Sequence, residues 1–130
     1  MSATEEDRIK SLAREFSRLD LLLLFGSRAR GDVHPRSDWD FGYLADPGFD
    51  ADDFLARLVL LLGTDRIDLV DLRRANGLLR YRAAAEGNPL FESAPDTFED
   101  FWFEAVSFWC DAGPILQQGY EAILRGLARA

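Results

Sequence analysis

The chain has 130 residues, of which 48% are hydrophobic and 29% charged, and its formal net charge is −8. This composition is typical of one globular domain and is too apolar for a disordered chain. We therefore expect a single domain over residues 1–130, with a motif-bearing core at about 10–92 and helices at about 95–130. Direct binding of nucleic acid is not expected, because an acidic chain lacks the surplus of Lys and Arg that neutralises phosphates.

Cysteine usage and the N-terminus bear on the compartment. The single Cys110 cannot form an internal disulfide, and His34 is the only histidine, which excludes a structural zinc site. No apolar run approaches the roughly 18–20 residues that span a bilayer. The first seven residues are acidic, whereas a signal peptide is basic and then apolar. We expect a soluble cytoplasmic protein with no membrane association.

The first predicted elements are a helix and a strand. Helical spacing of apolar residues predicts a helix over Thr4–Arg18, with Thr4 as the N-cap and Asp7 at the capping-box spacing. The run Asp20–Phe25 is apolar at nearly every position, so it predicts a strand with helices on both faces.

The alternation of helices and strands continues along the chain. In chain order we expect a turn and short helical segment at Gly26–Gly31, a loop at Asp32–Ser37, a strand at Trp39–Ala45, a helix from Asp50 or Asp52 to Leu62, a strand at Arg66–Leu72, a helix at Ala75–Glu86, an extended piece at Asn88–Ser93, a helix at about Pro95–Asp111 and a last helix at about Ile115–Ala128. The predicted fold class is α/β, a small mixed sheet with flanking helices and a C-terminal helical extension.

The chemistry-bearing residues lie around the first two strands. Ten residues separate Ser27 from Asp38. Residues two apart in a strand share a face, so Asp38 and Asp40 present adjacent carboxylates, which repel unless a cation neutralises them. Carboxylate and phosphate oxygens are the ligands that Mg²⁺ prefers. Gly26 and Ser27 offer backbone N–H groups and a hydroxyl that suit a phosphate. The pattern therefore predicts a triphosphate and metal site.

A third carboxylate is expected on the strand Arg66–Leu72. Asp68 is a poor strand residue unless the site needs it. Alternation places Asp68 and Asp71 on opposite faces. We favour Asp68, expected deep in the strand, because a solvated Asp71 near the strand end is unremarkable. Asp71 remains the alternative.

The combination of Gly26-Ser27, the Asp38-Trp39-Asp40 pair and an acidic third strand resembles the DNA polymerase beta-like nucleotidyltransferase superfamily. More closely, about residues 10–92 resemble the minimal nucleotidyltransferases, the antitoxins of HEPN–MNT toxin–antitoxin modules.

The resemblance implies roles for particular residues. Asp38, Asp40 and Asp68 would be catalytic and would bind two Mg²⁺ ions, and Gly26 and Ser27 would hold the β- and γ-phosphates of ATP. The implied reaction is transfer of AMP from ATP to a tyrosine of a cognate HEPN ribonuclease toxin, which silences the toxin. One alternative is an antitoxin that neutralises its partner by binding alone, with a vestigial nucleotide site. A weaker alternative is a metal-dependent transferase that uses a sugar nucleotide.

Several arginines admit two interpretations. Arg30 suits a triphosphate contact and an ion pair about equally, and for Arg28 an ion pair with Asp32 or a nearby carboxylate is favoured. His34 has no expected catalytic task. The arginines after the third strand are interpreted as a solvated helix face: Arg73, Arg74, Arg80 and Arg82.

The C-terminal third is acidic and aromatic. Residues 86–130 contain 8 acids and 2 bases, a net charge of −6. An apolar stripe at helical spacing, expected to pack on the sheet, consists of Phe98, Phe101, Trp102, Ala105, Phe108, Trp109 and Ala112. Phe103 lies off this stripe, and apolar surface left exposed beside acids would be a protein-binding patch. Cys110 is interpreted as a small buried hydrophobe.

Overall fold

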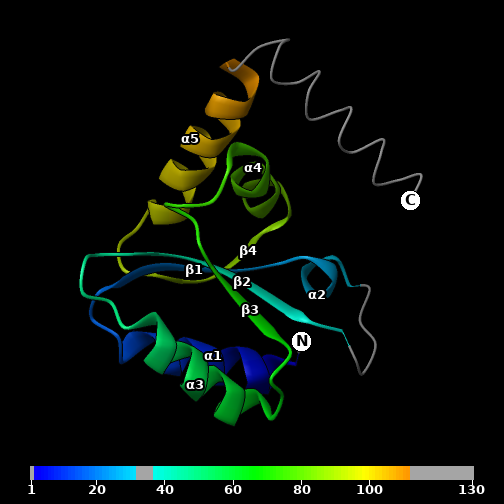
Figure 1. The fold of residues 1–130 in the computed structure, drawn as a ribbon, viewed down its shortest axis with the longest axis vertical. Coiled ribbons are helices and arrows are strands. Elements are labelled where there is room, and N and C mark those ends of the chain that lie inside the picture. Colours follow the sequence, from blue (N-terminus) through cyan, green and yellow to red (C-terminus); the bar gives the residue numbers. More distant parts are fainter. Residues whose placement is uncertain (1, 32–36, 112–130) are drawn as a thin grey trace.

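The structure is a computed structural model that describes residues 2–31 and 37–111. Within these residues a four-stranded sheet lies between two layers of helices (Figure 1). The elements are α1 (Ala3–Arg14), β1 (Leu19–Phe25), α2 (Ser27–Arg30), β2 (Trp39–Ala45), α3 (Ala51–Leu62), β3 (Ile67–Asp71), α4 (Gly77–Glu86), β4 (Asn88–Glu92) and α5 (Thr97–Asp111). The loop predicted over 32–36, with His34, and the helix predicted at 115–128 lie outside the described residues.

The sheet is mixed, as predicted, with strand order β3-β2-β1-β4. β1 pairs antiparallel with both β2 and β4, whereas β2 and β3 are parallel. The C-terminal end of β1 therefore lies beside the N-terminal ends of β2 and β3. This end of the strands brings together the Gly-Ser turn, the Asp-x-Asp pair and the start of the third acidic strand.

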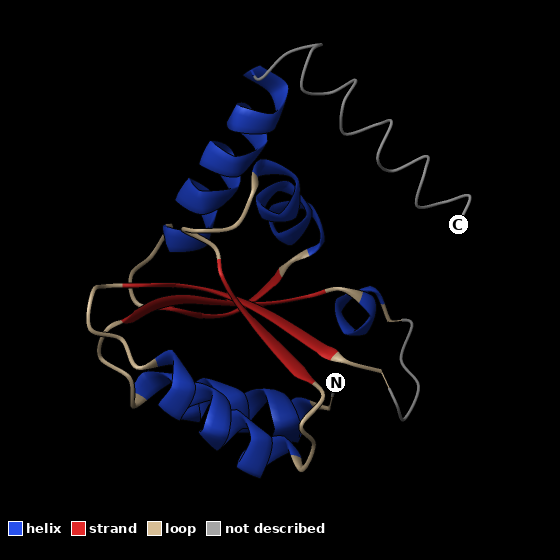
Figure 2. Ribbon diagram, viewed as in Figure 1, coloured by secondary structure: helices blue, strands red, loops and turns tan. Residues whose placement is uncertain are grey.

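β1 is buried on both faces, which confirms the prediction from its apolar run. Leu22 and Leu24 belong to a core shared with α1 and α3, and Leu21 and Leu23 to a core shared with α4 and α5. Figure 2 shows the same arrangement, with helices above and below the strands. Because each fully buried leucine contributes about 1.5–3 kcal/mol, this strand is a stable support for the turn that follows Phe25.

The first helix differs from its prediction at both ends. Its N-cap is Ser2, whose hydroxyl accepts a hydrogen bond from the Glu5 N–H at 3.1 Å while the Glu5 carboxylate accepts from the Ser2 N–H at 3.2 Å. Thr4 therefore lies inside the helix. The helix ends at Arg14 because the Glu15 and Phe16 N–H groups turn back to carbonyls three residues earlier.

Smaller boundary differences have local causes. The fourth helix begins at Gly77, not at Ala75, because the Asn76 side chain caps it by accepting from the Leu79 N–H at 2.8 Å. The third strand is Ile67–Asp71, one residue shorter at each end than predicted. None of the helices in the described part of the chain has both the length and the apolarity needed to cross a membrane.

Among the described residues, helix α5 packs against α4 and the sheet. Phe101 and Ala105 are buried, and Trp109 stacks on Tyr81 of α4 at a ring distance of 5.2 Å. Trp102 and Phe108, predicted as core, are 42% and 50% exposed, and Phe103 is 67% exposed. Cys110 is also exposed, so its interpretation as a buried hydrophobe was wrong. Helical spacing alone overestimated how far the neighbouring elements wrap around this helix.

Candidate active site

A cleft of about 450 Å³ opens at the edge where β1 ends and β2 begins. Three of its lining residues come from the Gly-Ser turn and α2, and two are the carboxylates of the Asp-x-Asp pair. The lining residues are Gly26, Ser27, Arg30, Ser37, Asp38, Asp40, Arg66 and Arg82. The cleft thus gathers the predicted phosphate-binding and carboxylate motifs.

Gly26 is required by the shape of this cleft. Its φ is +75°, a conformation that residues with a side chain rarely adopt. A Cβ on Gly26 would also collide with the Asp40 carboxylate, whose Cγ would lie 3.0 Å away. The glycine lets the start of α2 approach Asp40 closely, so Ser27 and the second carboxylate of the pair line the same cleft.

The sheet register brings Asp68 to the same edge. Asp40 pairs with Phe25 on one side and with Asp68 on the other. Burial raises the pKa of the Asp40 carboxyl, and the charges of Asp68 and Asp38 raise it further. The positive charges of Arg30 and Arg82 act in the opposite direction. Asp38 and Asp68 are therefore each near enough to repel the Asp40 carboxylate.

Asp71 lies at the other end of β3. Its register partner is Tyr43 near the end of β2, and its carboxylate accepts a hydrogen bond from the Arg73 N–H at 2.9 Å.

Asp68 is not deep in the strand as expected. It is the second residue of β3 and its side chain is exposed, because the strand begins only at Ile67. The parallel register, and not depth in the strand, places Asp68 beside Asp40.

The two arginines of the turn have different contacts. Arg28 donates from Nε and Nη2 to the Ser37 carbonyl, at 3.2 and 2.9 Å, and its guanidinium lies 4.1 Å from the Trp39 ring centroid. It therefore holds the entry to β2 through a carbonyl and a ring. Asp32, the carboxylate named for the expected ion pair, lies outside the described residues. Arg30 forms an ion pair with Glu86 of α4 at 3.2 Å. Whether Arg30 also binds nucleotide stays a prediction.

Three residues of the cleft were not predicted as site residues. Ser37 is buried at the start of β2, Arg66 precedes β3, and Arg82 projects from α4. Arg82 had been interpreted as part of a solvated helix face. No sequence signal marks Arg82 as a cleft residue, because the contact of Glu86 on the same helix with Arg30 is visible only in the structure.

The donor chemistry of the cleft fits Mg²⁺. In residues 2–31 and 37–111 no three Asp, Glu, His or Cys side chains are placed closely enough to enclose a metal ion. Asp38 and Asp40 line the cleft and Asp68 lies beside Asp40 in the sheet register; burial raises the pKa of Asp40, and the charges of Asp68 and Asp38 raise it further. A hard divalent cation would relieve that repulsion, and Asp38, Asp40 and Asp68 are the residues that would hold it.

Comparisons with known proteins agree with this geometry. Residues 7–96 match the family described as "Polymerase beta, Nucleotidyltransferase". The chain is 36% identical over 95 residues, 64% of its length, to "Protein adenylyltransferase MntA" of Aphanizomenon flos-aquae, and it spans 63% of that relative's length.

Two solved structures have the same fold over nearly the whole chain. A chain from a toxin–antitoxin crystal structure with AMP-PNP superposes with a TM-score of 0.74 at 30% identity, covering 95% of this chain and 98% of the other. A chain from a tri-AMPylated Shewanella oneidensis HEPN toxin in complex with its MNT antitoxin gives a TM-score of 0.70 at 27% identity, with coverages of 98% and 99%. The cleft and these matches together show that the chain belongs to the polymerase beta nucleotidyltransferase family.

Proposed function

We propose that this chain is a Mg²⁺-dependent protein adenylyltransferase that transfers AMP from ATP to a tyrosine of a cognate HEPN-type toxin, and so acts as an antitoxin. The observation that carries the proposal is the cleft in which Asp38 and Asp40 lie with the Gly26–Ser27 turn, together with the register that sets Asp68 beside Asp40. The adenylyltransferase name of the Aphanizomenon relative and the AMPylated HEPN toxin of the Shewanella complex support the same substrate and acceptor.

The proposed reaction is a nucleotidyl transfer. The phenol oxygen of the acceptor forms a bond to the α-phosphorus of ATP, and the bond from that phosphorus to the bridging oxygen breaks. AMP ends on the tyrosine, pyrophosphate leaves with the electron pair of the broken bond, and Asp68 takes the phenol proton. Gly26 and Ser27 hold the β- and γ-phosphates through backbone N–H groups and the hydroxyl.

Asp38, Asp40 and Asp68 would hold two Mg²⁺ ions. When bound, Mg²⁺ neutralises phosphate charge and favours ionisation of the attacking hydroxyl. Burial of Asp40 matters to this arrangement, because a carboxylate that is partly removed from water is a stronger partner for a cation than an exposed one. The lining of the cleft also includes arginines, which suit the phosphates.

A second candidate function is neutralisation of the toxin by binding alone. The exposed aromatic side chains of α5 favour a protein contact in either case. The intact carboxylate set and the positive φ of Gly26 favour the enzyme, because a vestigial site has no need of either. We also propose that the protein works in the cytoplasm, where ATP is available.

A label-transfer assay tests the proposed function. The chain is incubated with its cognate HEPN-type protein, Mg²⁺ and ATP labelled at the α-phosphate. We expect label on a partner tyrosine, and we expect the double variant Asp38→Asn, Asp40→Asn to lower the rate at least about 1,000-fold, since both oxygen ligand sets are lost. Its melting temperature should not fall, because the substitutions remove repelling charges.

Two outcomes would contradict the proposal, the first its active-site assignment and the second its catalytic activity. If the double variant labels the partner as fast as the unmodified chain, the carboxylates are not the active site. If no label appears while the partner's ribonuclease activity is still blocked, neutralisation by binding alone is correct.

A further inference from the structure

The cleft contains one arginine that has no direct partner among the described residues. Arg30 is paired with Glu86 at 3.2 Å. Within residues 2–31 and 37–111, the Arg82 guanidinium makes no hydrogen bond and no ion pair, although its charge acts on Asp40. An arginine in a cleft without a carboxylate partner keeps all its N–H donors for a ligand.

The position of Arg82 on α4 directs it to the phosphate side of the cleft. Arg82 and Glu86 are four residues apart, so they share one face of the helix. Glu86 contacts Arg30 of α2, and α2 begins at Ser27, the residue proposed to hold the terminal phosphates. The helix face that carries Arg82 therefore faces the start of α2.

Charge in the cleft favours a phosphate partner for Arg82. Asp38 and Asp68 already act on Asp40 as like charges, and a triphosphate adds further negative charge. During transfer, negative charge builds up on the pyrophosphate that leaves. A guanidinium offers a planar fork of donors that matches two phosphate oxygens, and hydrogen bonds between such charged groups are the strong ones.

We propose that Arg82 binds the β- and γ-phosphates of ATP and stabilises the departing pyrophosphate. This proposal rests on the proposed nucleotidyl transfer. The bond between the α-phosphorus and the bridging oxygen breaks, its electron pair stays on the pyrophosphate oxygen, and Arg82 faces the resulting charge. Arg82 takes no proton and forms no covalent bond. The competing view is that Arg82 only offsets the repulsion among the carboxylates of the folded chain.

Binding measurements on the full chain separate these views. Calorimetry in the presence of Mg²⁺ compares ATP, pyrophosphate and AMP for the unmodified chain, Arg82→Gln and Arg82→Lys. We expect Arg82→Gln to weaken binding of ATP and of pyrophosphate by about 10- to 100-fold, the effect of losing hydrogen bonds to a charged group. AMP affinity should change less than about twofold, and Arg82→Lys should regain part of the loss because it keeps the charge without the fork.

A matched control is Arg57→Gln, which removes an exposed arginine on α3 in the opposite helical layer. It should leave all three affinities unchanged. If Arg82→Gln binds ATP and pyrophosphate like the unmodified chain, or loses AMP equally, the assignment of Arg82 to the terminal phosphates is overturned. A lower melting temperature with unchanged affinities would establish the competing view. If the unmodified chain binds no ATP with Mg²⁺, the proposed function itself fails, which is a distinct result.

Discussion

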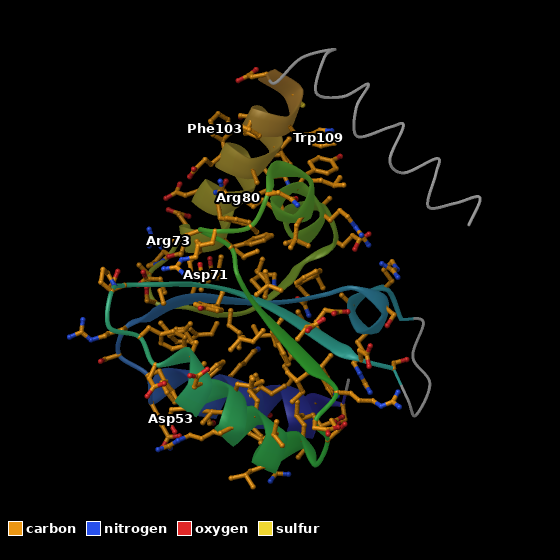
Figure 3. All side chains as sticks on the ribbon, viewed as in Figure 1. Asp53, Asp71, Arg73, Arg80, Phe103 and Trp109 are labelled. Carbon is orange, nitrogen blue, oxygen red and sulfur yellow. The ribbon has the colours of Figure 1, made fainter. Side chains whose placement is uncertain are left out.

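The two ends of the sheet both carry aspartates and arginines, but among the described residues these form ion pairs at one end and leave Asp40 without one at the other. At the end away from α2, Arg73 lies 3.8 Å from the Asp20 carboxylate, and Arg74 lies 3.8 Å from that of Asp71. Figure 3 shows Asp71 and Arg73 together on this side. At the cleft end, no ion pair of the described residues neutralises Asp40.

The pKa shifts of Asp20 and Asp40 show how far neighbouring groups offset the repulsion between carboxylates at each end of the sheet. Burial raises the pKa of Asp20, and the neighbouring Asp46 raises it further, but the Ser93 hydroxyl and Arg73 contact Asp20 and oppose the rise. Burial and two like charges raise the pKa of Asp40, and the opposing arginines act only across the cleft. Groups whose ionisation is perturbed without direct compensation are concentrated at functional sites. The comparison predicts that substitutions at the cleft end change activity and those at the far end change stability.

The largest contrast is expected between the two aspartates of β3. Asp68→Asn should lower the rate of label transfer by about 100- to 10,000-fold, because it removes both the proton acceptor and a metal ligand. Asp71→Asn should keep the rate within a few-fold and lower the free energy of unfolding by about 0.5–1.5 kcal/mol, since it weakens the hydrogen bond from the Arg73 N–H. Transfer rates and denaturant unfolding measure the two effects. The reverse ranking would make Asp71 the third carboxylate.

A second contrast compares two glycines that flank α2. Gly26 and Gly31 have φ of +75° and +85°, so alanine at either position costs about 1–3 kcal/mol of stability. A new Cβ meets the Asp40 carboxylate at Gly26, whereas at Gly31 it meets nothing within 4 Å among the residues that the structure describes. We expect Gly26→Ala to lower transfer about 100-fold by displacing Asp40.

Gly31→Ala serves as the control for backbone strain. It should reduce stability comparably and leave transfer nearly unchanged once the folded fraction is taken into account. Equal losses of activity in both variants would mean that α2 as a whole, and not the close approach to Asp40, determines the rate.

The sequence allowed prediction of features that depend on local pattern. The run Asp20–Phe25, the turn after it and the Asp38–Asp40 pair are read from neighbouring residues, and the structure confirms the strands and their mixed sheet. The capping box was misplaced because Thr4–Asp7 has the same spacing as Ser2–Glu5. The longer Glu5 side chain reaches back to the Ser2 N–H in the structure.

Features that depend on contacts between distant elements could not be predicted. Arg82 lines the cleft because α4 crosses the sheet toward α2, which no local spacing encodes. The exposure of Trp102 and Cys110 depends on which distant elements pack against α5. An amphipathic pattern predicts which face of a helix is buried, and it does not predict how wide the buried strip is.

The smallest expected effect concerns the acidic, aromatic face of α5. Trp102 and Phe103 are exposed there, and Figure 3 shows Phe103 on the side of α5 away from α4. Glu99 and Asp100 stand in the first turn of the same helix. Exposed aromatics beside acids suit a partner with basic surface, and a ribonuclease must have such surface to bind RNA. We expect this face to contribute to docking the HEPN-type toxin.

Replacing Glu99 and Asp100 with Gln and Asn should slow association with the toxin by a few-fold at low salt, because rim charges act mainly on the rate of encounter. Extending the change to Glu104 also breaks its contact with Arg80 at 3.4 Å, so that variant should be compared separately. The control neutralises Asp7 of α1 and Glu15, the residue that follows α1, and therefore changes the net charge of −8 by the same amount. Association rates measured across a salt series show whether the α5 acids or the total charge of the chain set the rate of encounter. If both double variants slow association alike, total charge alone steers the partner, and α5 is not the docking face.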